Sequence, residues 1–88
     1  MMMQTVVIEW RNPRTKSESE CWGETVFEGN IAKVFINARK NKNEIESADT
    51  FFHEMAHVFF DFNDKKLSNR KEEYLATKTG KIVAQLLK

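Results

Sequence analysis

The sequence predicts an α+β fold: a three-stranded antiparallel β-meander followed by two packed helices. Its 88 residues, of which 41% are hydrophobic and 31% charged, suffice for a single small domain that spans residues 1–88. In the first half, β-branched and aromatic runs alternate with turn residues, as is typical of short strands. In the second half, apolar residues recur at helical spacing, which predicts amphipathic helices.

Three β-rich runs define the predicted sheet. They are Thr5 to Trp10, Trp22 to Phe27 and Ile31 to Asn37. A short turn containing Gly29 joins the last two runs and predicts an antiparallel hairpin. Pro13 cannot continue a strand ladder, so the polar stretch from Asn12 to Glu20 is expected to be a solvated loop. Gly23 indicates a bulge or a close approach of two segments.

The first predicted helix begins where Asn43 and Glu46, or Ser47 shortly after, can form a cap. It is expected to run to about Asn63 and to end at the polar stretch Asn63-Asp64-Lys65. At 100° per residue its apolar side chains occupy one arc, opposite the two histidines of the chain. This arc contains Ala48, Phe51, Phe52, Met55, Ala56, Val58, Phe59 and Phe62.

The second predicted helix is capped by Ser68 or Asn69 and runs from about Arg70 to Leu87. Its apolar arc contains Leu75, Ala76, Ile82, Val83, Leu86 and Leu87. At the edge of this arc lie the small residues Gly80 and Ala84. Small residues at this place are expected to let the second helix approach the first closely.

The sequence His53-Glu54-Met55-Ala56-His57 is an HExxH motif on the first helix. Residues four apart project from one helix face, so His53 and His57 can both bind one zinc ion. Glu54 lies about 100° around the helix, beside the metal and not on it. In zinc peptidases of this type the glutamate is the general base. These are the only two histidines in the chain, so no second histidine cluster competes.

A catalytic zinc site needs a third protein ligand, which the second helix can supply. Glu73 shares its helix phase with Ala76, Gly80 and Ala84, which favours it over its neighbour Glu72. Asp61 lies two turns from His53 on the same helix, and three residues of one straight helix do not converge easily on one ion. The pattern HExxHxxGxxH is absent, because positions 60 and 63 hold phenylalanine and asparagine.

The chain resembles a known group of proteins over residues 22 to 87. The hairpin strand ending in Ile36-Asn37, the run Thr50 to His57, and a glutamate with small residues on the next helix carry the likeness. They resemble the zincin core of the ImmA/IrrE-like metallopeptidases and small HExxH proteins of phages and other mobile elements. The resemblance implies a minimal gluzincin-like core: His53 and His57 with a glutamate of the second helix as zinc ligands, and Glu54 as catalytic base. It also implies a protein substrate, often a repressor or regulator.

The chain departs from this group in two respects. Tyr74-Leu75-Ala76 follows the candidate glutamate, where ImmA-like proteins commonly have Glu-Ala-Asp. The segment between His57 and Glu73 is shorter than in many relatives. Both departures bear on the position of the third ligand and on the substrate.

The leading functional hypothesis is a zinc-dependent metallopeptidase that hydrolyses a peptide bond in a specific protein partner, with Zn²⁺ as cofactor. If Ile31 to Asn37 forms the sheet edge, it is expected to hold an extended substrate by main-chain pairing. The alternative is a zinc-stabilised, non-catalytic interaction or regulatory protein of a phage or mobile element. Glu54 favours the peptidase, because a structural zinc site has no use for a general base. Candidate oxyanion donors are Arg39, Arg70 and Tyr74.

Composition argues against several other classes of protein, namely nucleic-acid-binding, membrane and secreted proteins. A net charge of +1 provides no basic field for nucleic acid or a membrane surface. No run approaches the ~18 apolar residues of a membrane span. The first ten residues lack the features of a signal peptide. The single cysteine, Cys21, fits a reducing compartment, so a cytoplasmic location is expected.

Overall fold

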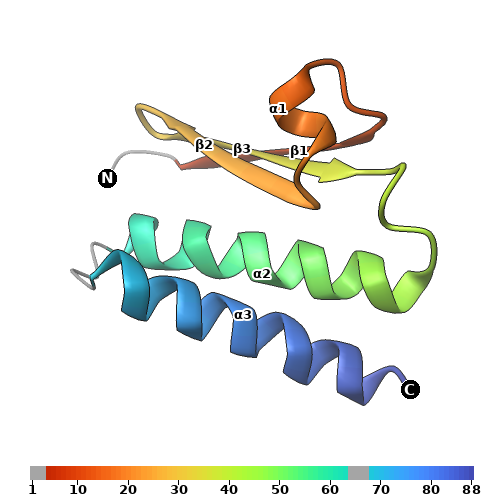
Figure 1. Cartoon of the computed structure of the whole chain (residues 1–88). Coiled ribbons are helices and arrows are strands. Elements are labelled where there is room, and N and C mark those ends of the chain that lie inside the picture. The colour runs from red at the N-terminus through yellow and green to blue at the C-terminus, as the bar shows by residue number, and fades with distance from the viewer. Residues whose placement is uncertain (1–3, 64–67) are drawn as a thin grey trace.

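A three-stranded sheet, a long helix packed against it and a second helix packed against the first form three layers (Figure 1). The computed structural model describes residues 4–63 and 68–88. The element order is β1 (Thr5–Arg11), α1 (Lys16–Ser19), β2 (Gly23–Glu28), β3 (Ile31–Asn37), α2 (Glu44–Phe62) and α3 (Asn69–Leu86). This arrangement is α+β, as predicted. None of the helices in the described ranges is long and apolar enough to cross a membrane.

The strand order is β1-β3-β2, so the predicted antiparallel meander is wrong. β2 and β3 do form an antiparallel hairpin, which turns at Gly29 with a φ of 61°. This left-handed conformation favours glycine. β1 pairs in parallel with β3, with Thr5 opposite Ile31 and Arg11 opposite Asn37. β3 is therefore the central strand, and the expectation that it forms the sheet edge is also wrong.

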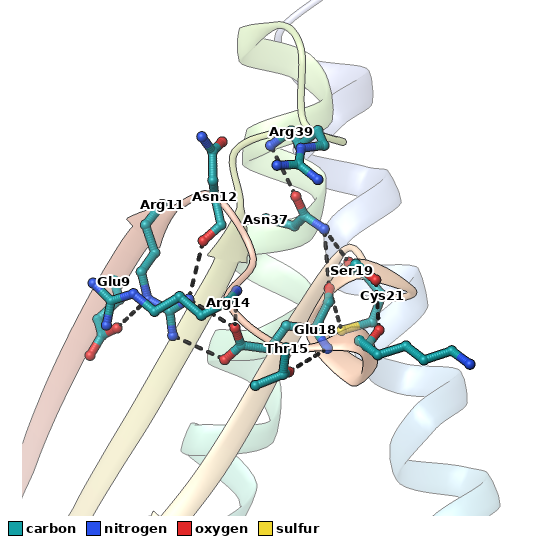
Figure 2. Close-up of polar contacts among 11 residues, drawn as sticks. Glu9, Arg11, Asn12, Arg14, Thr15, Glu18, Ser19, Cys21, Asn37 and Arg39 are labelled. Atoms are coloured by element: carbon teal, nitrogen blue, oxygen red, sulfur yellow. Dashed lines mark hydrogen bonds and ion pairs between the residues drawn. The ribbon is translucent and has the colours of Figure 1, made fainter.

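The connection between β1 and β2 explains the different topology. It contains α1, where a solvated loop was expected. The Glu18 side chain is only 16% exposed, and its carboxylate accepts two hydrogen bonds from the Arg11 guanidinium, at 2.9 and 3.0 Å (Figure 2). The amide of Asn37, the last residue of β3, donates to the carbonyl oxygens of Glu18 and Cys21. The chain thus crosses the end of β3 and returns as β2 on its far side.

The hydrophobic core lies between the sheet and α2. Its buried cluster is Ala32, Val34, Ile36 and Val58, against which Val6, Phe51, Met55 and Phe62 pack. Two members of the predicted α2 arc do not belong to the core. Phe52 and Phe59 are 39% and 55% exposed, because α2 contacts β2 and β3 and its side below β1 remains open.

Both long helices begin at a side-chain cap. The Asn43 side chain accepts a hydrogen bond from the Glu46 N–H at 2.8 Å, which confirms the predicted start of α2. The Ser68 hydroxyl accepts one from the Lys71 N–H at the start of α3. α2 ends at Phe62, and most of the expected break at residues 63–65 lies outside the described residues.

A strip of small residues allows α3 to pack closely on α2, as expected. Ala76, Gly80 and Ala84 are buried. A Cβ at Gly80 would lie 2.5 Å from the Asp49 carbonyl oxygen, so only glycine fits there without a backbone shift. The larger members of the predicted arc lie elsewhere: Ile82, Leu86 and Leu87 are 54% to 79% exposed.

The ion pair that fixes α1 predicts a specific response to acid. Hydrogen bonds from the Arg11 guanidinium, and then from the Arg14 backbone N–H, lower the pKa of Glu18 to about 2. A carboxylate whose folded pKa is depressed stabilises the fold above its unfolded pKa of about 4.3 and loses that effect as pH falls. We expect Glu18→Gln to lower the melting temperature at pH 7, and the difference from the native protein to disappear between about pH 4.3 and pH 2.

Circular dichroism melts of metal-free protein across this pH range provide the measurement. The exposed Glu20, in the same connection, supplies a matched control, and Glu20→Gln should follow the native curve. Parallel curves for Glu18→Gln and the native protein down to pH 2 would contradict the role given to the ion pair.

Candidate metal centre

The two histidines of the HExxH motif face the start of α3. They lie one turn apart on α2, and their ring centroids are 5.2 Å apart. Both side chains are largely enclosed, with 22% of His53 and 17% of His57 exposed. The helix therefore presents two imidazoles side by side at a partly solvated position.

α3 brings the Glu73 carboxylate between them. One oxygen lies 2.9 Å from His53 Nε2, and the other lies 3.1 Å from His57 Nε2. Ligand atoms of His53, His57 and Glu73 all fall within 4.8 Å of one another. No other group of this kind occurs in residues 4–63 and 68–88. The structure thus places together the three residues that the sequence indicated as metal ligands.

The hydrogen-bond roles around His57 favour a cation at this position. His57 Nδ1 lies 2.6 Å from a Glu72 carboxylate oxygen, which can only accept when ionised. A hydrogen on Nδ1 leaves Nε2 of neutral His57 as an acceptor, facing another acceptor oxygen on Glu73 at 3.1 Å. Two acceptors this close need a cation or an additional proton between them. Two imidazole nitrogens and one carboxylate are the donors that zinc prefers, so the residues fit Zn²⁺.

Glu72 has a role that sequence reasoning missed. The sequence suggests Glu72 only as a competing ligand, but its carboxylate contacts the outer nitrogen of His57, Nδ1, instead. Such a carboxylate fixes the tautomer and the ring orientation of a metal-binding histidine. In the sequence, the only indication of this role is that Glu72 and Glu73 are consecutive acidic residues. Both lie in the first turns of α3, where the helix dipole favours negative charge.

Glu54 lies beside this group and outside it. The residue is 8% exposed, and its carboxylate accepts a 2.6 Å hydrogen bond from the Thr25 hydroxyl on β2. Gly23 makes this approach possible, since a Cβ there would lie 2.7 Å from Thr50 Cγ2 and 3.2 Å from Glu54 Cγ. Gly23 thus marks a close approach of β2 to α2 and not a bulge. Thr25 was not identified from the sequence, because nothing local connects it with α2.

Two clefts meet at the centre, between β2 on one side and α3 on the other. The first has a volume of about 400 Å³ and is lined by the histidines, Glu72, Glu73, Thr25 and Phe27. The second, of about 440 Å³, extends along α2 past Asp49 to Trp22 and Lys81. Gly23, His53 and Glu54 line both clefts. An extended ligand could therefore lie across the histidines from one cleft to the other.

Other polar residues considered from the sequence lie apart from the centre. Arg39, Arg70 and Tyr74 line neither cleft. Tyr74 is 59% exposed, with the Lys78 ammonium 5.9 Å from its ring centroid. Asp61 is exposed and belongs to no metal-binding group among the described residues. None of the three candidate oxyanion donors therefore lines the clefts at the centre.

Comparisons with protein-family models, with curated proteins and with solved structures found no match for this chain.

The geometry predicts that one zinc ion binds per chain and that the motif residues differ in their effect on it. His57→Ala should lose the metal and lower the melting temperature, because metal binding adds to the free energy of unfolding. Glu54→Gln should retain about one equivalent, because Glu54 lies outside the ligand group. Element analysis and calorimetric titration measure both. Equal loss of zinc in Glu54→Gln and His57→Ala would contradict the roles assigned to them.

The two glutamates of α3 should also differ in their contribution. Glu73→Gln removes a proposed ligand and should weaken zinc binding more than Glu72→Gln does. Glu72→Gln removes a contact that orients a ligand, a change that typically costs about 10–100-fold in metal affinity. A competition titration with a chromogenic chelator gives both affinities, and the opposite order would exchange the roles of the two residues.

Proposed function

We propose that this chain is a minimal zinc-dependent metallopeptidase of the HExxH type, similar to the zincin core of the ImmA/IrrE-like enzymes. The observation that supports this most directly is the convergence of His53, His57 and Glu73, with Glu54 buried beside them. Structural zinc sites use four protein ligands, whereas catalytic sites use three and keep one position open. The described residues supply three candidate ligands.

The chemistry divides between the metal and Glu54. Bound zinc supplies a Lewis acid that polarises the scissile carbonyl and lowers the pKa of water. Glu54 accepts the proton of the attacking water and returns it to the leaving amine. The hydroxyl of Thr25, 2.6 Å from the carboxylate, holds Glu54 on the sheet side of the histidines. Glu72 keeps the His57 ring in the orientation that directs Nε2 toward Glu73.

The substrate is held at the edge of β2 in this proposal. β2 replaces β3 in that role, because β3 lies in the middle of the sheet. An extended peptide that pairs with β2 passes along both clefts, and its main chain supplies the affinity. The clefts have volumes of only about 400 and 440 Å³, so contacts made elsewhere by a folded protein partner would position the scissile bond. The expected substrate is therefore a specific protein, with low activity on generic peptides.

The cellular setting is part of the same proposal. A net charge of +1 offers no field that would attract nucleic acid or a membrane surface. The chain has one cysteine, and burial raises the pKa of its thiol, which makes it less reactive. A cytoplasmic protein with a protein or peptide substrate is consistent with these features.

Turnover can be tested by comparing the native protein with Glu54→Gln, both loaded with zinc. After incubation with lysate of the natural host, mass spectrometry should find new peptide termini with the native protein. Loss of a general base typically reduces the rate by about 10²–10⁴-fold, so these termini should be nearly absent with the variant.

Identical termini with both proteins would indicate a contaminating protease and contradict the proposal. If neither protein produces termini and both retain the same partner equally well, the zinc-stabilised, non-catalytic interaction protein becomes the better description. Zinc content is measured on both samples, so loss of metal cannot imitate loss of the base.

A further inference from the structure

Among residues 4–63 and 68–88, six large apolar side chains are exposed on the side of the molecule that faces away from the metal centre. We call this side the β1 flank; its members are Ile8, Trp10, Phe52, Phe59, Ile82 and Leu86. Their exposed fractions range from 39% to 79%. Monomeric proteins rarely expose contiguous apolar patches of more than a few hundred Å², so the β1 flank requires an explanation.

Two members belong to β1. Ile8 and Trp10 are in register with Val34 and Ile36 of β3, so their side chains point to the face of the sheet that carries α2. Val34 and Ile36 are almost completely buried there, whereas Ile8 and Trp10 are 47% and 55% exposed. The reason is that α2 makes most of its sheet contacts with β2 and β3, and on β1 the core reaches only Val6. The face of the sheet is therefore open below Ile8 and Trp10.

Two further members lie on α2. Phe52 and Phe59 are seven residues apart and so occupy one side of the helix. Glu54 lies roughly 140–160° around the helix from both and reaches Thr25 on β2. Because β1 and β2 are opposite edges of the sheet, Phe52 and Phe59 lie on the side below β1.

α3 contributes the remaining two. Ile82 and Leu86 are one turn apart and lie roughly 100–180° around α3 from Thr77 and Lys81. Thr77 and Lys81 line the cleft beside the metal centre. Ile82 and Leu86 therefore point away from that cleft, toward the same side as the exposed residues of β1 and α2.

The strand β1 also has an unprotected edge. It pairs with β3 over seven consecutive residues without a bulge, and no strand in the described part of the chain pairs with its other edge. Soluble proteins usually protect such an edge with lysine, proline or a bulge. The sequence of β1, TVVIEWR, has none of these. Its charged residues, Glu9 and Arg11, are already paired with each other.

We propose that a second copy of this chain covers the β1 flank, with the two β1 strands paired antiparallel across a two-fold axis at Ile8. In this register Val6 faces Trp10 of the other copy, so apolar residues meet on the helix-bearing face. Glu9 faces Val7, and Arg11 faces Thr5, so no like charges lie opposite each other. The strand is thus complementary to itself, as a two-fold interface requires.

Strand spacing shows that the helices can fit below such a sheet. Strands lie about 4.8 Å apart, so two α2 helices, each below the β2–β3 boundary, would be separated by about four spacings, or ~19 Å. A helix with its side chains is about 10–12 Å wide, which leaves a channel of ~8 Å. Phe52, Phe59, Ile8 and Trp10 of both copies would fill this channel.

The exposed area agrees with a second copy as the occupant. A large apolar or aromatic side chain has roughly 150–250 Å² of surface, so the β1 flank presents on the order of 700 Å². One partner in a standard stable interface buries about 800 Å². Main-chain pairing along β1 would supply the rest. Both β2 edges and both metal centres remain free at the two ends of the joined sheet, so dimerisation is independent of the proposed peptidase activity.

Sedimentation equilibrium of the full chain between about 1 and 100 μM tests the proposal. The expected mass is twice the 10.3 kDa of one chain. Ile8→Lys places two like charges opposite each other at the axis and should raise the dimer dissociation constant at least ~100-fold. Val26→Lys is the matched control: it introduces the same charge at a comparably exposed position, 43% against 47%, on the opposite edge strand, and should leave the dimer intact.

Leu86→Lys provides a second variant that does not threaten the fold, because Leu86 is 79% exposed in the single chain. It should weaken the dimer by about tenfold or more, with an unchanged circular dichroism spectrum. A native protein that stays monomeric to 100 μM would overturn the proposal. So would a mass above two chains, or equal effects of Ile8→Lys and Val26→Lys.

Discussion

The close packing of α3 on α2 is the constraint on which the metal centre depends. The ligand atoms come from two helices that are separated in sequence, so their distance is set by the helix interface and not by either helix alone. Gly80 sets that interface, because a side chain there would collide with the backbone of Asp49. Glu73 lies seven residues before Gly80, two turns along the same side of α3, and so reaches the histidines. Gly80 therefore positions a carboxylate that it does not touch.

Sequence reasoning located the parts of this protein that depend on local spacing. The HExxH motif needs only one helix, and the caps at Asn43 and Ser68 involve neighbours three residues away. The place of Glu73 also followed from spacing, because the helix contact is made by a periodic strip of small residues.

Features that depend on contacts between distant segments could not be read in this way. The position of β1 depends on hydrogen bonds to Glu18 in α1. The Arg11 guanidinium donates to the Glu18 carboxylate, and the Asn37 side-chain amide donates to the Glu18 carbonyl oxygen. The contact of Thr25 with Glu54 joins residues of β2 and α2 that no periodicity relates. The exposure of Phe52 depends on where α2 lies below the sheet, which a helical projection does not contain.

The parallel pairing of β1 has a consequence for the order in which the chain folds. The β2–β3 hairpin closes across a turn at Gly29, which costs little loop entropy, whereas Thr5 must find Ile31 across the whole of α1 and β2. Pairing between segments so far apart in sequence forms slowly. The hairpin also carries Thr25, and the metal centre takes all its residues from segments after Trp22. β1 is thus expected to join the domain last and to open first in native-state hydrogen exchange. The free edge of β1, which is exposed to other chains, therefore belongs to the least cooperative segment of the fold.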